Sequence, residues 1–205
     1  MNYDTIKEEI KDIDITLPPP QEEPERQYYF IKKLQHWMEL KKEEKGRELT
    51  CRVNTFGCQM NARDSEKIIG ILMTIGYKVV EDEDADLVIF NTCTVRENAN
   101  LKVYGRLGQL KKIKNKNPEM ITMLCGCMMQ EKEVVEKIKK TYRFVDLIFG
   151  THNIFKLAEL VSICLEERLE ELEAQGREDK KPKHKMVVDV WKDTDQIVED
   201  LPVER

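Results

Sequence analysis

One unit repeats along residues 49–165: a short apolar run, a turn, and a longer stretch with the period of an amphipathic helix. The helical stretches cover residues 62–75, 95–115, 129–142 and 153–172, and the apolar runs read LTCRVNTF, YKVV, DLVIFNT, MITMLC and DLIFG. Short, nearly continuous apolar strands that alternate with helices are typical of a parallel sheet with both faces covered. The repeat therefore predicts an α/β fold, Rossmann-like or flavodoxin-like, with a mostly parallel sheet of about five strands and helices on both faces.

The junction between the second and third apolar runs fits this repeat poorly. Only EDEDA, residues 81–85, separates the two runs, whereas the crossover between parallel strands usually takes a dozen or more residues. We therefore expect the second strand to be brief, displaced or differently oriented.

The segments before the repeat differ from it in composition. Residues 1–24 are acidic, contain PPP and show no sustained period, so we expect a mobile arm. Residues 25–48 place apolar side chains at helical spacing, which predicts an amphipathic helix. The face of this helix that would dock on the domain carries Phe30, Leu34, Trp37 and Met38.

The segment after the repeat, residues 166–205, is highly charged and contains Gly176 and Pro182. It predicts a helical extension followed by a linker, with one strand-like piece near residues 187–191. No closing element follows this piece, so we expect the segment to lead towards a further domain that the chain lacks.

The composition excludes some classes of function. A net charge of -5 and an isoelectric point near 5.5 argue against a chain that works mainly by coating a nucleic acid, because such domains carry a strongly basic surface. The longest apolar run, IIGILMTI, is far shorter than the roughly 20 residues that a membrane span needs. The N-terminus lacks the basic and apolar regions of an export signal. We therefore expect a cytoplasmic protein without membrane contact, whose thiols stay reduced.

Three of the six cysteines fall at turns between a predicted strand and the helix that follows: Cys58, Cys93 and Cys127. The carboxyl ends of parallel strands meet at one edge of a sheet, where open α/β sheets bind their ligands. A thiol beside a helix N-terminus also has a lowered pKa, which favours ligation of an anionic metal cluster. Position alone leaves a shared site and simple packing equally open, because free cysteine is among the most buried residue types.

The other three cysteines fit a structural role better. Cys51 lies inside a predicted strand and Cys164 lies on the apolar stripe of a predicted helix, so we expect both to pack in the core. Cys125 lies two residues before Cys127, and from the alternation of a strand we expect it to face a helix layer.

Longer motifs around the three turns resemble the N-terminal domain of the tRNA methylthiotransferases. The matching segments read TFGCQMNARDSEKIIGILMTIGY, ADLVIFNTCTVRENANLKVYGRLGQL, LCGCMMQ and IFGTHNI. Within the family, GCQMN and NTCTVREN are most similar to the MiaB type, which modifies isopentenyladenosine beside the anticodon. The resemblance covers residues 49–165 and the final segment DLPVER. It implies that residues 49–165 form the cluster-binding domain of such an enzyme.

In that family the domain binds a 4Fe-4S cluster through three cysteines, which correspond here to Cys58, Cys93 and Cys127. Three ligands leave one iron open, and the resemblance implies that this iron holds the sulfur or methylthio group destined for the nucleoside. A second 4Fe-4S cluster, bound by CxxxCxxC in a radical-SAM domain, cleaves S-adenosylmethionine. No CxxxCxxC occurs in this sequence. We therefore expect a fragment that carries sulfur, contains no catalytic residue and cannot catalyse alone.

The resemblance also implies partners. tRNA would bind mainly through the missing domains, and the radical-SAM domain of the full-length enzyme would accompany this one. We expect the chain to be a monomer.

Polar residues near the cysteine turns are candidates for the surroundings of the cluster or for substrate contact: Asn61, Asp64, Asn91, Thr94, Arg96, Glu97 and Asn98. A positive charge such as Arg96 would stabilise an anionic cluster or bind a phosphate. Asn61, Thr94 and Glu97 instead fit a helix-capping role better. Basic residues on the second helix are candidates for tRNA contact: Lys102, Arg106, Lys111, Lys112, Lys114 and Lys116. The alternative is a solvated helix face, which is the commoner role of a run of charges.

Two other functions fit the same edge of the sheet. The first is a metal- or cofactor-binding module without tRNA modification, in which the cysteines hold zinc or the edge holds a flavin for electron transfer. A closed zinc site normally has four protein ligands, and no glycine-rich or hydroxyl-rich loop follows the first strand to bind a flavin phosphate. The second is a purely structural α/β domain whose cysteines are incidental.

Overall fold

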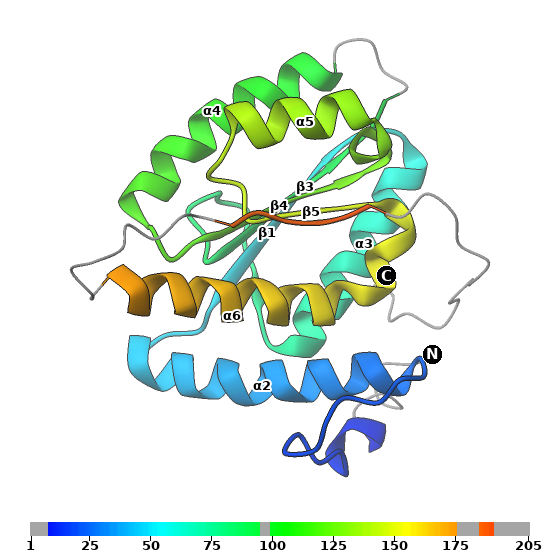
Figure 1. Cartoon of the computed structure of the whole chain (residues 1–205), viewed down its shortest axis with the longest axis vertical. Helices are drawn as coiled ribbons and strands as arrows, with labels where there is room; N and C mark the ends of the chain where they lie inside the picture. The colour runs from blue at the N-terminus through cyan, green and yellow to red at the C-terminus, as the bar shows by residue number, and fades with distance from the viewer. Residues whose placement is uncertain (1–7, 95–98, 176–184, 191–205) are drawn as a thin grey trace.

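A six-stranded sheet lies at the centre of the structure, a computed structural model that describes residues 8–94, 99–175 and 185–190 (Figure 1). The strands run in the order β2-β1-β3-β4-β5-β6, and every neighbouring pair is parallel. Their bounds are Thr50–Phe56 (β1), Lys78–Val79 (β2), Leu87–Thr92 (β3), Ile121–Gly126 (β4), Leu147–Phe149 (β5) and Val187–Asp189 (β6). The predicted parallel α/β fold is confirmed, with one strand more than expected.

The additional strand is β6, which pairs with β5 at one edge of the sheet. Hydrogen bonds hold the end of β6 in place: the Asp189 carbonyl accepts from the backbone N–H of Gly150 (3.1 Å) and from Asn153 Nδ2 (2.8 Å). The sequence shows a strand-like piece here but not its partner, since pairing between distant segments depends on which sheet edge is left free.

The second strand, β2, explains the short connection that follows it. It pairs with β1 only at Thr50↔Lys78 and Cys51↔Val79, on the outer edge of the sheet. Because β2 has only two residues, the chain advances a short way along the sheet before it returns to the amino edge. Residues 80–86 are long enough for this return, and β3 then starts opposite Cys51. The expectation of a brief second strand is confirmed, and this strand is parallel to its neighbour.

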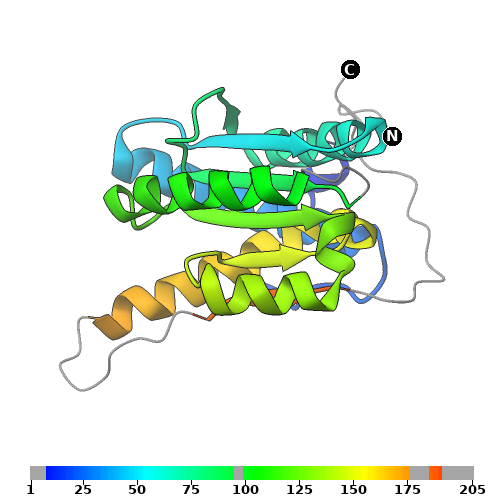
Figure 2. The ribbon, with the colours of Figure 1, turned by 90° about the horizontal axis from the view of Figure 1, so that it is seen from above.

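Helices cover both faces of the sheet. α3 and α6 lie on one face with α2 stacked outside them, and α4 and α5 lie on the other (Figure 1). Seen from above, the strands point in one direction (Figure 2). The helices are α2 (Glu25–Lys45), α3 (Gln59–Ile75), α4 (Ala99–Lys116), α5 (Lys132–Thr141) and α6 (Leu157–Gln175), with 3-10 helices η1 (Cys127–Gln130) and η2 (Thr151–Lys156). Within the described ranges, no helix is both long and apolar enough to cross a membrane.

Side chains of the central strands alternate between two cores. On β3, Leu87 and Ile89 belong to the core beneath α3 and α6, whereas Val88 and Phe90 belong to the core beneath α4 and α5. All four side chains are fully buried. Burial on both faces explains why this strand is a continuous apolar run in the sequence.

The helix predicted before the first strand docks on the outside of α6. Phe30, Leu34 and Met38 of α2 are buried, and these are residues of the predicted apolar face. At the start of α2, Arg26 Nε donates to Glu159 Oε2 of α6 (3.1 Å). Apolar contacts along the helix and an ion pair at its start thus hold α2 against the domain.

Residues 8–24 pack against this helix, although their composition predicted a mobile arm. Ile10 is buried in the core that α2, α3 and α6 share. The Tyr29 hydroxyl donates to the carbonyl of Ile15 (3.1 Å). Isoleucines spaced among the acidic residues supply these contacts, which the average composition of the segment does not reveal.

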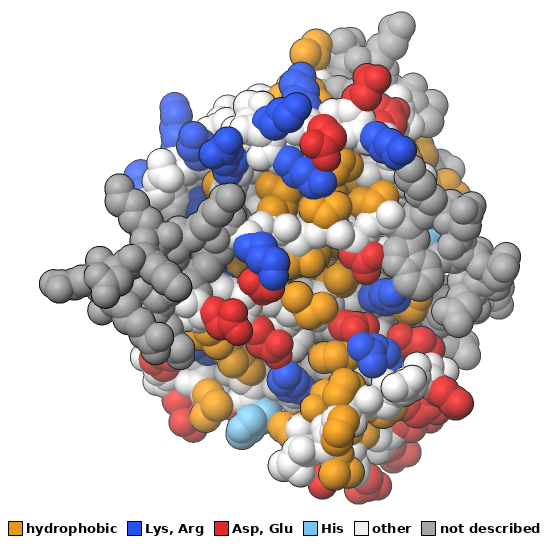
Figure 3. All heavy atoms as spheres, in the orientation of Figure 1, with side chains coloured by type: hydrophobic (Ala, Val, Ile, Leu, Met, Phe, Trp, Pro, Cys, Tyr) orange, Lys and Arg blue, Asp and Glu red, His pale blue; other side chains and the backbone are white. Residues whose placement is uncertain are grey.

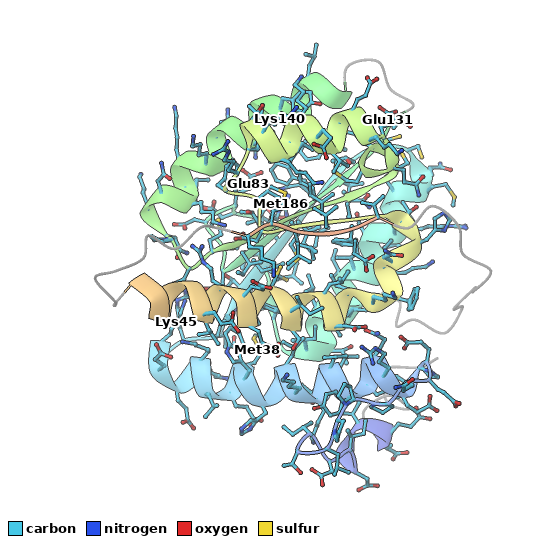
Figure 4. All side chains as sticks on the ribbon, viewed as in Figure 1. Met38, Lys45, Glu83, Glu131, Lys140 and Met186 are labelled. Atoms are coloured by element: carbon cyan, nitrogen blue, oxygen red, sulfur yellow. The ribbon has the colours of Figure 1, made fainter. Side chains whose placement is uncertain are left out.

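Asp86, just before β3, ties several segments together at the amino edge of the sheet. Arg47 donates to both carboxylate oxygens (2.7 and 2.8 Å) and Lys45 donates to Oδ1 (3.2 Å). The backbone N–H of Thr50 donates to Oδ2 (2.8 Å), and Figure 4 shows Lys45 at the end of α2. Burial acts to raise the pKa of Asp86, but these hydrogen bonds outweigh it and hold the pKa well below its ordinary value.

Lys114 departs from the basic helix face that the sequence predicted. It is buried, and its ammonium donates to Asp146 Oδ2 and to the carbonyl of Phe144 (2.7 Å). Asp146 also accepts from the backbone N–H of Thr122 (2.6 Å). Burial lowers the pKa of Lys114, while the Asp146 carboxylate acts in the opposite direction. A count of charges along α4 could not show this, because the side that each lysine faces depends on how α4 packs.

We expect Lys114→Met to lower the free energy of unfolding by about 3–5 kcal/mol, because it leaves the Asp146 carboxylate buried without its cation. Lys112→Met, on the exposed side of the same helix, is the matched control and should change this free energy by less than about 0.5 kcal/mol. Urea denaturation measures both. Equal stability of the two variants would contradict a stabilising role for the buried pair.

Candidate metal centre

The pairing of β1, β3 and β4 brings three cysteine-bearing turns to one edge of the sheet. In the register, the last residues of these strands lie side by side: Phe56, Thr92 and Gly126. Cys58 follows two residues after β1, while Cys93 and Cys127 follow β3 and β4 directly. The three turns predicted from the sequence therefore do meet at the carboxyl edge.

Cys58 caps the N-terminus of α3, which begins at Gln59 rather than at residue 62 as the helical period predicted. The backbone N–H groups of Asn61 and Met60 donate to its sulfur and lower the pKa of the Cys58 thiol. In return, Asn61 Oδ1 accepts from the backbone N–H of Cys58 (3.1 Å). The cap of this helix is thus Cys58, and Asn61, predicted as the cap, completes the capping box from inside the helix.

Cys93 and Cys127 differ in burial. Cys93 is fully buried, and its thiol is one of the smaller contributions that lower the pKa of Cys58. Cys127 is half-buried, and its sulfur accepts from the backbone N–H of Thr94 (3.3 Å), the residue after Cys93. The Cys127 thiol also lies 3.7 Å from the carbonyl of Thr92, to which it donates.

This set of donors suits an iron-sulfur group. Such clusters take thiolate ligands, and backbone N–H groups that point at sulfur stabilise their negative charge. As they stand, the side chains are not closed around a metal, since no three His, Cys, Asp or Glu side chains in the described part of the chain form a metal-holding group. The structure brings Cys58 and Cys93 together and holds Cys127 at the neighbouring turn.

Two glycines allow the close packing of these turns. A Cβ on Gly57 would lie 2.2 Å from Asn61 Oδ1, so the space beside this glycine is taken by the asparagine. A Cβ on Gly126 would lie 2.0 Å from the carbonyl oxygen of Thr92. Gly126 also has a φ of +100°, which L side chains rarely adopt. Steric room is needed at both glycines, and the backbone conformation adds a second requirement at Gly126.

The remaining cysteines pack in the core, where the sequence placed Cys51 and Cys164. Cys51, Cys125 and Cys164 are all buried in the core beneath α3 and α6. Burial raises the pKa of the Cys51 thiol to about 12 and raises that of Cys125 well above its ordinary value. Burial thus favours the neutral thiol at Cys51 and Cys125, whereas hydrogen bonds lower the pKa of Cys58.

The polar candidates near the turns have mixed outcomes. Arg96 and Asn98 lie outside the described residues. Asn91 is fully buried and donates to Ser65 Oγ (3.0 Å). Sequence reasoning did not single out Ser65, although it lies four residues after Asn61 and so on the same face of α3.

Figure 3 shows lysine and arginine side chains gathered over α4 and α5. Lys102, Lys111, Lys112 and Lys116 are exposed on α4, as the sequence predicted. Arg106 is exposed too but donates to Glu83 Oε1 (2.6 Å), which offsets part of its charge. The exposed basic side of α4 is therefore narrower than the sequence indicated.

A match to a known protein family covers the central part of the chain. Residues 50–150 match the uncharacterized protein family UPF0004, so this part of the chain is a domain of that family.

Particular relatives define the family further. The chain is 60% identical over 163 residues to the tRNA-2-methylthio-N(6)-dimethylallyladenosine synthase of Lachnoclostridium phytofermentans, a match that covers 80% of this chain and 32% of the relative. It is 46% identical over 185 residues to the synthase of the same name in Acetivibrio thermocellus, a match that covers 90% of this chain and 35% of the relative. The chain thus spans about a third of the length of these relatives. The resemblance seen in the sequence is confirmed: the chain belongs to the tRNA methylthiotransferases.

We expect Gly126→Ala to lower the free energy of unfolding by roughly 1–3 kcal/mol, because the added Cβ meets Thr92 and the positive φ becomes strained. Gly105→Ala is the matched control, since a Cβ there has nothing within 4 Å. In the interior of α4 this change should stabilise the protein by about 0.5–1 kcal/mol. Thermal unfolding of both variants would show opposite shifts, and a neutral Gly126→Ala would contradict the close approach of β3 and β4.

In the metal-free protein we expect iodoacetamide to label Cys58 much faster than Cys51 at pH 7. Cys58 is half-buried with a lowered pKa, whereas Cys51 is buried with a pKa of about 12. Because the thiolate is the nucleophile, labelling of Cys58 should persist as the pH falls below the ordinary thiol pKa of about 8.5. Timed alkylation followed by peptide mass spectrometry measures both rates. Similar rates would count against this difference between the two sulfurs.

Proposed function

We propose that residues 49–165 are the sulfur-carrying domain of an enzyme that methylthiolates N6-isopentenyladenosine next to the anticodon of tRNA. The observation that carries the proposal is the single sheet edge at which the turns of Cys58, Cys93 and Cys127 meet. The names of the relatives, tRNA-2-methylthio-N(6)-dimethylallyladenosine synthases, support the choice of nucleoside.

The three cysteines would ligate a 4Fe-4S cluster through their thiolates and leave one iron open. When bound, this cluster supplies the sulfur or methylthio group that enters the nucleoside. The protein's part is to hold the thiolates in place and to stabilise their charge. Backbone N–H groups of Met60 and Asn61 do so at Cys58, and the N–H of Thr94 does so at Cys127.

The complete reaction needs more than this domain. We propose that a second 4Fe-4S cluster and S-adenosylmethionine act in a radical-SAM domain of the full-length enzyme, because this sequence contains no CxxxCxxC. Residues 166–205 would lead towards that domain. Residues 25–48 would form the segment with the docked helix α2, and residues 1–24 the N-terminal arm, of which residues 8–24 pack against that helix. On this proposal the chain alone is inactive.

The exposed side of α4 would contact tRNA phosphates through Lys102, Lys111 and Lys112. Arg106 would contribute less, because Glu83 pairs with it. With a net charge of -5, this domain would supply a small share of the affinity for tRNA, and other domains of the enzyme would supply the rest. We propose a cytoplasmic monomer.

After anaerobic reconstitution with iron and sulfide, we expect about four irons per chain and the visible absorption of a 4Fe-4S cluster. Substitution of any one of Cys58, Cys93 or Cys127 by alanine should remove most of the iron that binds per chain. Alanine at the buried Cys125 is the matched control, because it lies two residues from a ligand, and it should leave iron content unchanged.

Iron and sulfide analysis with visible spectroscopy measures the outcome. Stoichiometric zinc in place of iron would favour a zinc-binding module, and the absence of any bound metal would favour a structural domain. Either result would refute the proposed function.

A further inference from the structure

Two buried asparagines, Asn61 of α3 and Asn91 of β3, lie between the cysteine turns. Asn61 Nδ2 donates to Asn91 Oδ1 (3.1 Å), and Asn91 Nδ2 donates back to the carbonyl of Asn61 (2.8 Å). Their exposed fractions are 3% and 0%. Buried amides are costly unless their hydrogen bonds are made, so this reciprocal bonding holds the pair in one arrangement.

The direction of each amide is determined by backbone groups. Asn61 Oδ1 accepts from the N–H of Cys58 (3.1 Å), and Asn61 Nδ2 donates to the carbonyl of Thr92 (3.1 Å). A flipped amide would place NH2 against N–H and oxygen against oxygen. Asn91 is oriented in the same way, because its Nδ2 faces the carbonyl of Asn61.

The pair reaches every one of the three cysteine turns. Asn61 makes the bonds to the first two turns: it accepts from the backbone N–H of Cys58 and donates to the carbonyl of Thr92, the residue before Cys93. At the third turn, Gly126 stands so close that a Cβ on it would lie 2.7 Å from Asn91 Oδ1. Gly126 directly precedes Cys127, so the same two amides border all three turns.

Helix capping accounts for only part of this arrangement. A cap needs only the bond from Cys58 N–H to Asn61 Oδ1. The bonds that Asn61 Nδ2 makes to Asn91 and Thr92 connect α3 to β3 and satisfy no group at the helix end. They fix the distance between the first two cysteine turns.

We propose that the Asn61–Asn91 amide pair is a positioning device that sets the three cysteine turns before any metal binds and so determines how firmly a cluster is held. This inference rests on the proposed function for its effect on the cluster. Ligands that are already in place lose less freedom when a metal binds, and groups that orient ligands typically change metal affinity by about 10–100-fold.

The test compares Asn61→Ala and Asn91→Ala with Ser65→Ala. Ser65 belongs to the same buried network, because it accepts from Asn91 and is hydrogen-bonded to Thr55 (2.7 Å). Among the described residues, it makes no side-chain bond to a cysteine turn. After reconstitution, the rate of iron release to a chelator is measured. We expect release about 10–100-fold faster from both asparagine variants, and release within about threefold of wild type from Ser65→Ala.

A second measurement uses the metal-free protein and does not depend on a cluster. Iodoacetamide labelling of Cys127 should become faster in Asn61→Ala, although no described bond joins these two residues, because the amide pair couples the turns. Circular dichroism confirms that each variant is folded, and Asn61→Ser or Asn91→Ser replaces the alanine variant at the same position if that variant does not fold.

The two measurements separate failure of this inference from failure of the proposed function. If wild type binds no iron, the proposed function fails, and faster labelling of Cys127 alone then supports the positioning role. Iron release and Cys127 labelling equal to those of Ser65→Ala, in folded asparagine variants, would overturn it.

Discussion

The cysteine edge depends on how closely β4 approaches β3 where the two strands end. Thr92 is paired with Gly126 in the register, and the Thr92 hydroxyl donates to the carbonyl of Cys125 (2.7 Å). Only glycine fits opposite Thr92, because a Cβ on Gly126 would lie 2.0 Å from the Thr92 oxygen. A wider spacing would carry Cys127 away from Thr94, whose N–H bonds its sulfur, and the third turn would leave the site.

The two edges of the sheet are held by different chemistry. At the amino edge, buried carboxylates before β3 and β5 bind cations: Asp86 binds Arg47 and Lys45, and Asp146 binds Lys114. At the carboxyl edge, the hydrogen bonds that hold the cysteine turns join neutral amides, hydroxyls and backbone groups. Because none of these groups carries a net charge, they add no carboxylate beside the sulfurs. The buried carboxylates that join the strand starts to their cations thus lie at the edge opposite the sulfurs.

The fold class could be predicted because strands buried on both faces are apolar throughout, while the helices between them keep their own period. The positions of the edge strands could not, since β6 and β2 pair wherever backbone groups of β5 and β1 are left free. Lys114 illustrates the same limit for a side chain. Its neighbours in the sequence suggest a solvated basic face, and only the packing of α4 turns it towards Asp146.

The sequence by itself determined the parallel α/β class, the placement of three cysteines at strand ends and, through its motifs, the family. These features are local, because each strand, turn and helix is encoded within one continuous segment. Only the tertiary structure decided what surrounds the sulfurs: that Cys93 is buried against Cys58, and that Asn61 and Asn91 meet between the turns. Such contacts join different strand-helix units, so they depend on the register of β1, β3 and β4, which the packing of the whole sheet sets.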